Sequence, residues 1–394
     1  MNFEKIKLED ITESDAKEIV ELRRYFHQHP EPSLKEYNTS KKIKSLLDEW
    51  GIEYQSVGET SVLGIIHGNR VGNKTILLRA DMDALEMKDR KDVPYRSTKE
   101  GLHHACGHDG HTAALLVAAK ILKQKQNEFG GTVKFAFQQA EEIGAGARQF
   151  VDSGHLGDVD MVFGIHLNSE YPTGSIVLAS GARYASCDIF KIHVQGESAY
   201  AAKPHLAKDA LLSAGHIVVA LQSIVSRNID PLEPAVISIG VLHAGTRYNV
   251  IANDAYIEGT IRALSRESRQ KMLSLVEEIA RHTARVQNTD IEFSNYPAAN
   301  VLINDEKATI FAQQVAKQIV GEVIEHAPAT LGAEDFADFL ERVPGTFAYV
   351  GTRNLQDSST HYPHHHELFD IDERGLHVAA QLHIKIALDF LASE

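Results

Sequence analysis

The stretch His103-His104-Ala105-Cys106-Gly107-His108-Asp109-Gly110-His111 places imidazoles, a thiol and a carboxylate within one short run. These are the side chains that bind first-row divalent cations, and Gly107 and Gly110 permit the tight turns that let several of them converge. A structural zinc finger would need a second Cys or His pair at finger spacing, and the sequence contains no Cys-x-x-Cys. The stretch therefore predicts a metal site, against the alternative of a polar loop with incidental histidines.

Composition limits the classes of function. With 394 residues, of which 43% are hydrophobic and 24% charged, the chain is long enough for two or more globular domains. Its formal net charge of -14 argues against nucleic acid or an anionic membrane as the main partner. The first residues lack an apolar signal core, and no apolar run approaches the ~18 residues of a spanning helix. Cys106 and Cys187 are the two cysteines, so we expect a reducing, cytoplasmic location.

Helix and strand patterns alternate through the first half of the chain, which favours an α/β domain with a largely buried sheet. Candidate ligands follow three expected strands: Asp81 and Asp83, then Glu141 and Glu142, then His166. Because sites in open α/β sheets lie at the carboxyl ends of strands, we expect one common pocket. The expected helices are 15–27, 37–50 and 112–122, and the expected strands are 62–67, 75–79, 132–138 and 161–165.

The pattern changes in the middle of the chain, where strand, helix, strand, strand, helix and strand follow each other as in a ferredoxin-like sandwich. These elements are 188–195, 209–226, 235–242, 255–263, 266–287 and 291–295. The first pattern then resumes with 305–320, 333–341, 346–350 and 373–391. We therefore expect a catalytic domain built from residues 1–183 and 298–394, with residues 184–297 inserted into it.

Two pairs of acidic residues have local alternatives. Asp81 and Asp83 are spaced so that both face one side of an extended segment, which suits a ligand or an acid that orients a metal-bound imidazole; a solvated loop is the alternative. Glu141 and Glu142 repel each other unless a cation lies between them or one is protonated. They also fit the first turn of a following helix, where the helix dipole stabilises acids. Beside the His/Cys loop, we favour catalysis for this pair.

The remaining histidines are less specific. His166 ends an apolar strand, where a lone histidine is more often a satisfied core residue. His364, His365 and His366 are consecutive, so they cannot all be ligands, and we expect one or two of them to face inward.

The ordered motifs resemble the aminoacylase-type co-catalytic metallopeptidase family, in its amidohydrolase branch of hippurate hydrolases, indole-acetyl-amino-acid hydrolases and N-acetyl-diaminopimelate deacetylases. The resemblance covers essentially the whole chain. The matching residues are Arg23-Arg24 with His27 and Pro30-Glu31, Leu78-Arg79-Ala80-Asp81-Met82-Asp83-Ala84-Leu85, His104 to His111, Gln139-Ala140-Glu141-Glu142, Asn249-Val250-Ile251, Gly259-Thr260-Ile261-Arg262, Gly332-Ala333-Glu334-Asp335-Phe336, and His365 four residues before Phe369.

This resemblance implies a zinc-peptidase-like catalytic domain with a ferredoxin-like lid and dimerisation domain. It also implies two divalent metal ions per subunit, which the residue types leave open between zinc, manganese, cobalt and nickel. Glu141 would be the general base, and Asp83 would orient the site. The implied metal ligands are Cys106, His108, Glu142, His166 and His365.

The inserted block carries the implied substrate-binding residues His205, Asn249 and Arg262, of which Arg262 suits a carboxylate. Tyr200 stands where relatives usually have a histidine, and Ala252 replaces a common proline. We expect the block to pair two chains in a homodimer and to complete each active site across the interface; a lid that serves only its own chain is the alternative.

The implied activity is hydrolysis of the amide bond of N-acyl amino acids, either hippurate-like or N-acetylated, by a metal-bound water. A metallopeptidase that acts on dipeptides or short peptides is the nearest alternative. A non-catalytic metal-binding scaffold is a third, but Glu141 argues against it, because a binding protein needs no base beside its ligands.

Overall fold

The computed structural model describes residues 5–393, which form two compact units. Unit 1 comprises the chain up to Gly181, Ile303–Pro328 and the chain from Asp335 onward, so it draws on both ends of the sequence. Unit 2 comprises Ala182–Leu302 and Ala329–Glu334. That unit 2 acts as a lid and a dimerisation domain remains a prediction.

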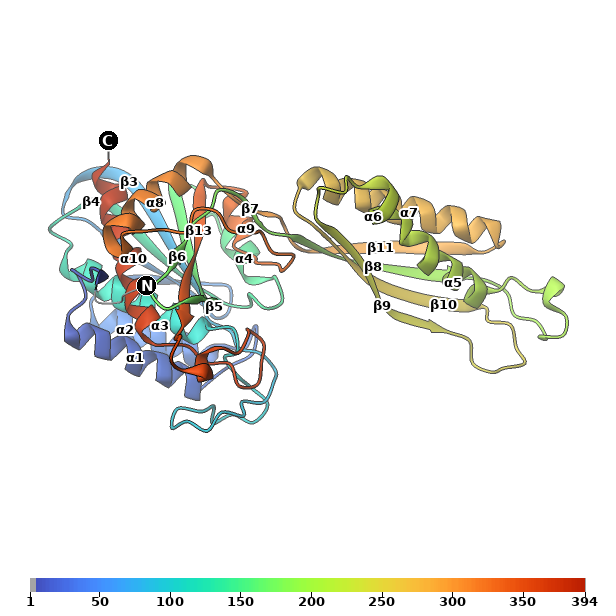
Figure 1. Ribbon diagram of the computed structural model, residues 1–394, viewed down its shortest axis with the longest axis horizontal. Coiled ribbons are helices and arrows are strands. Elements are labelled where there is room, and N and C mark those ends of the chain that lie inside the picture. The colour runs from blue at the N-terminus through green and yellow to red at the C-terminus, as the bar shows by residue number, and fades with distance from the viewer. Residues whose placement is uncertain (1–4, 394) are drawn as a thin grey trace. The chain divides into compact units, whose positions relative to one another are not determined.

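A seven-stranded sheet forms the centre of unit 1 (Figure 1). Its order is β1 (Glu53–Val57), β2 (Ser61–His67), β4 (Gly130–Gln138), β3 (Arg70–Asp81), β5 (Met161–Pro172), β13 (Gly345–Arg353) and β6 (Ile176–Val177). The central strands β4, β3, β5 and β13 run parallel, while β1, β2 and β6 are antiparallel to their neighbours. The α/β class is therefore confirmed, and the carboxyl ends of the parallel strands share one edge of the sheet.

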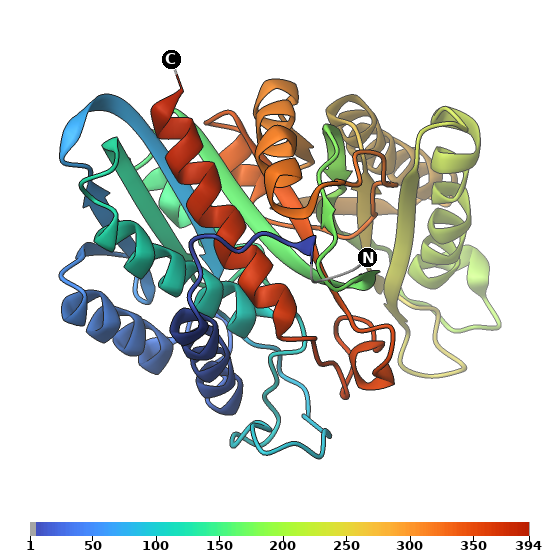
Figure 2. The same ribbon diagram turned by 60° about the vertical axis from the view of Figure 1, so that its left-hand side comes forward.

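The helices of unit 1 are α1 (Glu13–Gln28), α2 (Tyr37–Glu49), α3 (His108–Gln124), α4 (Gly146–Asp152), α8 (Glu306–Val320), α9 (Ala337–Leu340) and α10 (Arg374–Ala392). A capping box of Thr12 and Asp15 starts α1. Helices α3 and α10 pack against each other and against β3 (Figure 2). Residues 108–119 of α3 are all buried, which explains why this helix is rich in small and apolar side chains rather than amphipathic.

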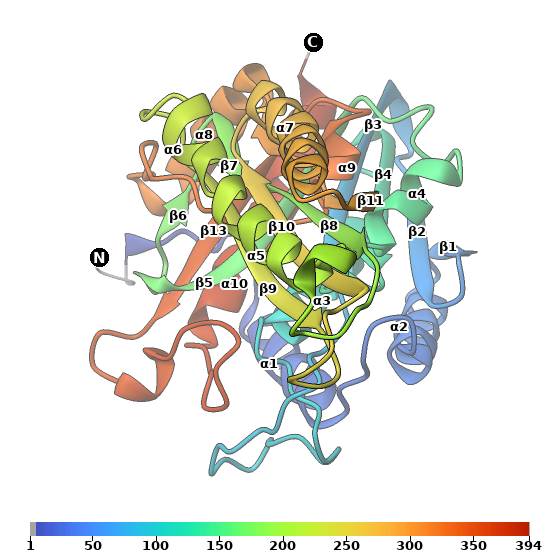
Figure 3. The same ribbon diagram turned by 90° about the vertical axis from the view of Figure 1, so that its right-hand side faces the viewer.

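Unit 2 has the ferredoxin-like arrangement that the order of its elements predicts. Its antiparallel sheet has the order β11 (Asp290–Ala299), β8 (Ser186–Gln195), β10 (Asp254–Ala263) and β9 (Ala235–Ala244). Helices α5 (Ala210–Leu221), α6 (Ser223–Asn228) and α7 (Arg266–Val286) pack on this sheet around a core of their own (Figure 3). Strands β7 (Gly181–Tyr184) and β12 (Leu302–Asn304) pair in a separate two-stranded sheet.

Several expected elements have different bounds. Strand β5 continues to Pro172, so His166 lies inside a strand rather than after one. Helix α3 begins at His108, earlier than the expected helix. The single helix expected at 209–226 is divided into α5 and α6 at Gln222. Of the expected element 333–341, only Ala337–Leu340 is helical.

Candidate metal centre

The sheet register places several candidate residues of unit 1 at the same height along neighbouring strands. Asp81 of β3 pairs with Gln138 of β4, and the Glu141-Glu142 loop follows. Arg79 pairs with Gly164 across β3 and β5. His166, two residues beyond Gly164, therefore lies level with Asp81.

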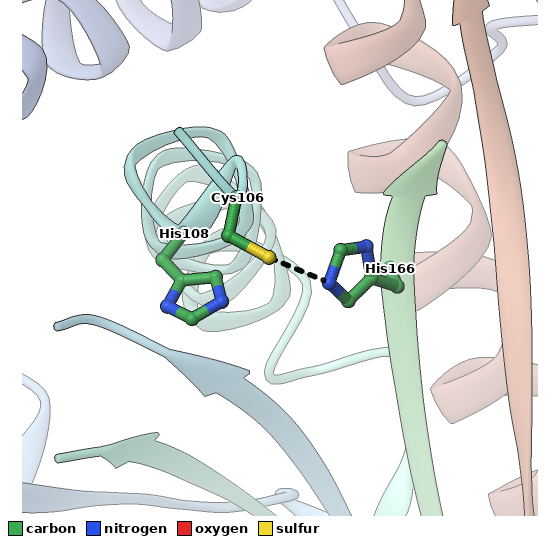
Figure 4. Close-up of side chains that lie close together, drawn as sticks. All are labelled: Cys106, His108 and His166. Carbon is green, nitrogen blue, oxygen red and sulfur yellow. Dashed lines mark hydrogen bonds between the residues drawn. The ribbon is translucent and has the colours of Figure 1, made fainter. Parts of the chain in front are cut away.

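The loop before α3 depends on its glycines. Gly107 has a φ of 93°, a left-handed conformation that strains most other residues, and it is the N-cap of α3. A Cβ at Gly110, in the first turn of α3, would lie 2.6 Å from Leu167 Cδ1 and 2.8 Å from Leu376 Cδ2, so a larger residue would have to displace these side chains. The first turn of α3, and the loop that precedes it, therefore lie close to β5. As a result, Cys106 Sγ lies 3.5 Å from His166 Nε2 (Figure 4).

The carboxylate of Asp83 holds the acidic pair in place. Its Oδ1 accepts the backbone N–H of Glu141 at 3.1 Å, and its Oδ2 accepts that of Glu142 at 3.1 Å. Ser33 Oγ donates a further hydrogen bond to Oδ2 at 2.6 Å. Asp83 thus anchors two glutamates and does not have to reach a metal ion to position the site. His108 Nδ1 lies 2.9 Å from the Asp83 carbonyl oxygen, which orients its ring as well.

The glutamates converge on His108 and His365. Nε2 of His108 lies 3.9 Å from Glu141 Oε2 and 3.9 Å from Glu142 Oε1. Nε2 of His365 lies 3.5 Å from Glu142 Oε2. His365 has a φ of 62°, and its backbone N–H donates to the Ala105 carbonyl at 2.9 Å, which joins its loop to the loop of Cys106.

The neighbours of His365 point in different directions. The ring of His364 lies 5.1 Å from that of His166, whereas His366 stacks on Tyr362 at 4.7 Å. His364 and His365 therefore face the cluster and His366 does not, in line with the expected one or two inward histidines.

The acidic side chains of the cluster lie close together and away from solvent, and this shifts the pKa values of several groups. Burial raises the pKa of Glu142 to about 7. For His108, burial opposes the charged form, but Asp81, Asp83 and Glu142 outweigh it and raise the pKa to about 10. Burial and the neighbouring His111 hold the pKa of His166 well below its usual value, so its ring is neutral, as a metal ligand requires. The arrangement calls for a positive charge between the acids.

Unpartnered atoms test whether a metal fits. Within residues 5–393, the buried atoms His108 Nε2 and Glu142 Oε1 have no hydrogen-bond partner, although they face each other. Leaving such groups unpaired costs free energy, which a shared cation would recover. Three sets of side chains have donor atoms close enough to hold an ion: Cys106 with His108 and His166, Cys106 with Glu142 and His365, and His108 with Glu141 and Glu142. Their sulfur, nitrogen and oxygen donors suit zinc, cobalt, nickel or manganese.

Our sequence interpretation missed a buried network behind the cluster. Arg79 pairs with Asp81 at 2.7 Å and with Asp335 at 2.8 Å. Asp81 also lies 2.5 Å from His111 Nδ1, and His111 Nε2 accepts the backbone N–H of Leu167 at 2.9 Å. The network ties β3, β5 and α3 together under the cluster. The signal in the sequence was an arginine inside an apolar strand, because such a residue is buried only with partners.

In unit 2, the segments that carry two of the three predicted substrate-binding residues contact each other. The loop before His205 pairs with the Asn249 loop, since Ala201 N–H donates to the Asn249 carbonyl at 3.1 Å. Arg262 lies near the other end of β10, where it donates to the Leu331 carbonyl at 3.0 Å. Arg262 is eight positions after Asp254, where β10 begins, which corresponds to about 26 Å along a strand. The Asn249 loop lies beyond that beginning.

Comparison with known proteins identifies the family of this chain. Residues 77–389 match the family described as Peptidase family M20/M25/M40. An N-acetyl-L-cysteine deacetylase of Bacillus subtilis is 39% identical over 91% of this chain and 85% of its own. A hippurate hydrolase of Campylobacter jejuni is 37% identical over 95% of this chain and 97% of its own. The crystal structure of a dinuclear metal binding peptidase from the M20 family of Bacillus subtilis has a TM-score of 0.85 and 35% identity, and covers 97% of this chain and 100% of that chain. The chain therefore belongs to the M20/M25/M40 peptidase family.

Proposed function

We propose that this protein is a di-metal amidohydrolase that cleaves the amide bond of N-acyl amino acids. The observation that carries the proposal is the pair Glu141 and Glu142, which Asp83 fixes by two backbone hydrogen bonds within 3.9 Å of His108 Nε2. Such a pair divides two tasks between adjacent carboxylates: one binds a cation, and the other moves a proton.

Glu142 and His108 supply the two unpartnered atoms that a cation would satisfy, so we assign them as ligands together with Cys106, His166 and His365. Glu141 is the general base. Two divalent ions held by these residues would lower the pKa of a water molecule and polarise the carbonyl oxygen of the amide. Glu141 would accept a proton from the attacking water and return it to the leaving amine. Asp83 holds the base at the required position throughout.

N-acyl amino acids are the proposed substrates because the relatives named above are a deacetylase of N-acetyl-L-cysteine and a hippurate hydrolase. Cleavage of dipeptides or short peptides is the second candidate, which the family description supports. Protein freed of metal and reloaded separately with zinc, manganese, cobalt or nickel should hydrolyse N-acetyl amino acids or hippurate faster than dipeptides. Faster turnover of dipeptides with every metal would favour the second candidate.

We further propose that the active protein is a homodimer in which unit 2 contributes to the partner's site. An N-acyl amino acid is much shorter than the about 26 Å that separates the Arg262 and Asn249 ends of β10. One chain therefore cannot bring Arg262 and Asn249 to the same substrate molecule, whereas two chains can.

An apolar face of unit 2 supports this pairing. Leu211, Leu212 and Val219 are 53%, 47% and 72% exposed on α5, and a Cβ added at Gly215 between them would meet no atom within 4 Å. By length and composition, the helical stretch Ala210–Asn228 is apolar enough to cross a membrane, and 33% of an 18-residue segment within it is buried. Because the other face of α5 packs on a sheet, we assign the exposed face to a second copy of this chain. The neighbouring strand β9 is an edge strand that offers unpaired backbone groups.

Mixed dimers test the pairing. Glu141→Gln chains are mixed with Asn249→Ala chains or, separately, with Arg262→Ala chains, each variant being nearly inactive alone. If Asn249 and Arg262 reach a substrate from different chains, one of the two mixtures regains turnover and the other does not. Failure of both mixtures after verified subunit exchange would show that the site is complete within one chain.

A reducing compartment such as the cytoplasm suits the proposed role of Cys106, because a ligand must be a thiolate and not half of a disulfide. Both Cys106 and Cys187 are free thiols in the described chain.

A further inference from the structure

A second group of metal-binding side chains lies in unit 1 and shares no residue with the catalytic cluster. It comprises His27 of α1, Asp89 and His103, whose side chains are at most 1% exposed. His27 Nε2 lies 3.2 Å from Asp89 Oδ2, and His103 Nε2 lies 3.9 Å from Asp89 Oδ1. All three donor atoms are within 4.8 Å of one another, as they would be around one ion.

An ammonium group already lies among these three atoms. Lys91 Nζ is 2.7 Å from His103 Nε2, 3.0 Å from His27 Nε2 and 3.1 Å from Asp89 Oδ1. An ammonium has three N–H donors and no acceptor, so these three contacts use its whole capacity. The Lys91 side chain is only 5% exposed, which places the charge in a dry environment.

Two of the three acceptors, those of His27 and Asp89, are held in the orientation that metal ligands have. Asp109 Oδ2 lies 2.6 Å from His27 Nδ1, and a carboxylate accepts, so Nδ1 carries the proton and Nε2 presents its lone pair. The same carboxylate–histidine pairing orients imidazoles on metal ions. The carboxylate of Asp89 is fixed by the backbone N–H groups of Ser97 at 3.0 Å and Lys91 at 3.1 Å.

The charges around the group favour a cation. Two buried cations, Arg23 and Lys91, face three buried carboxylates, Asp89, Asp109 and Asp370, which leaves one net negative charge. Glu373 also pairs with Arg23, but Arg24 balances its charge. Removal of the Lys91 ammonium would leave two net negative charges beside two imidazoles in a place without solvent. Such a place binds a divalent ion strongly.

We propose that His27, Asp89 and His103 form a cation site separate from the catalytic pair, and that the ammonium of Lys91 fills it in place of a divalent metal ion. Two imidazoles and one carboxylate suit zinc, cobalt or nickel. The segment 103–109 supplies His103 to this site, and Cys106 and His108 to the catalytic cluster. Lys91 therefore keeps a metal ion from being captured on the wrong side of the loop that must hold the catalytic ions.

Metal counting tests the proposal with the full-length protein. Wild type, Lys91→Ala and Lys91→Met are loaded with Co²⁺, dialysed, and analysed for cobalt per chain. Lys91→Ala removes the charge and opens the space, so it should bind one ion more than wild type. Lys91→Met removes the charge but fills the space, so it should bind the same number as wild type. A Lys91→Ala/His103→Ala double variant should also return to the wild-type number.

The cobalt spectrum identifies the location of the extra ion. The Lys91 site has no sulfur, so the extra ion should add visible ligand-field absorption without added thiolate-to-cobalt absorption in the near ultraviolet. Because the readout is a difference from wild type, it does not depend on the number of ions in the catalytic cluster, or on whether the proposed activity is correct.

Stability provides a second measurement if Lys91→Ala folds poorly. Both Co²⁺ and propylammonium chloride should raise its thermal midpoint, and the two should compete, whereas Lys91→Met should respond to neither through this site. Equal cobalt content in Lys91→Ala and wild type would overturn the proposal. So would an extra ion that persists in the double variant, or midpoints that neither cation changes.

Discussion

Asp83→Asn is the most informative single substitution, because it keeps the shape of the side chain while it removes one acceptor and the charge. Asp83 now accepts hydrogen bonds from Glu141 N–H, Glu142 N–H and Ser33 Oγ–H. In asparagine, one carboxylate oxygen becomes an amino group that faces a backbone N–H, so two donors oppose each other.

The expected cost follows from these contacts. A hydrogen bond to a charged acceptor contributes about 1.5–3 kcal/mol, and an unsatisfied buried donor costs about 1–3 kcal/mol. Asp83→Asn should therefore lower the free energy of unfolding by about 3–5 kcal/mol. Because one or both glutamates also lose their anchor, turnover should fall by about 10²-fold, the usual effect of a displacement near 1 Å at a catalytic group.

Urea unfolding of the metal-free protein and hydrolysis of an N-acetyl amino acid by the reloaded protein measure the two effects. Ser33→Ala is the matched control: it removes one hydrogen bond to the same carboxylate, should cost about 1.5 kcal/mol, and should leave turnover nearly unchanged. Wild-type stability and turnover in Asp83→Asn, or equal losses of turnover in both variants, would refute the anchoring role.

Three further predictions concern the metal centre. Glu141→Gln should keep its metal and lose about 10²–10⁴-fold in turnover, whereas Glu142→Gln should lose metal as well; equal metal content in the two variants would contradict this division of roles. Cys106→Ser should bind metal more weakly, because an alcohol is a poorer anionic ligand than a thiolate, and Cys187→Ser should not; metal analysis after dialysis decides between them. In the metal-free protein the pKa of Glu142 is raised to about 7, so the folded state binds that proton more tightly than the unfolded state. The resulting stability is complete below the ordinary pKa near 4.5 and is lost as pH rises through 7, by about 3 kcal/mol in all. Urea unfolding at pH 5 and pH 8 should show this loss in wild type and not in Glu142→Gln.

The sequence predicted the parts of the site that depend on local order along the chain. Asp83, Glu141 and Glu142 follow strands, and parallel strands bring such positions to one edge, so their proximity could be predicted without a structure. Strand bounds were less certain: β5 continues past His166, because the strand pairs with β13 up to Pro172, and that partner lies almost two hundred residues later.

Contacts between segments that are far apart along the chain produce no periodic pattern in the sequence. The Arg79–Asp335 pair joins residues 256 positions apart, and the Lys91–His27 contact joins residues 64 positions apart. Periodicity in a single sequence reports which face of an element is buried, and it does not report which polar partner meets a buried arginine or lysine. These networks therefore had to be found in the structure.

The order of strands in unit 1 also constrains how the protein is made. Strand β13 lies between β5 and β6, although residues 178–344 are synthesised between those strands and β13. During synthesis, the position of β13 in the sheet stays unfilled until residue 345 has been made. The segment Ala182–Leu302, which forms most of unit 2, can already fold before that point. His365 emerges only after β13. The last of the proposed metal ligands is consequently synthesised only when the chain is almost complete, although Cys106, His108, Glu142 and His166 are available earlier.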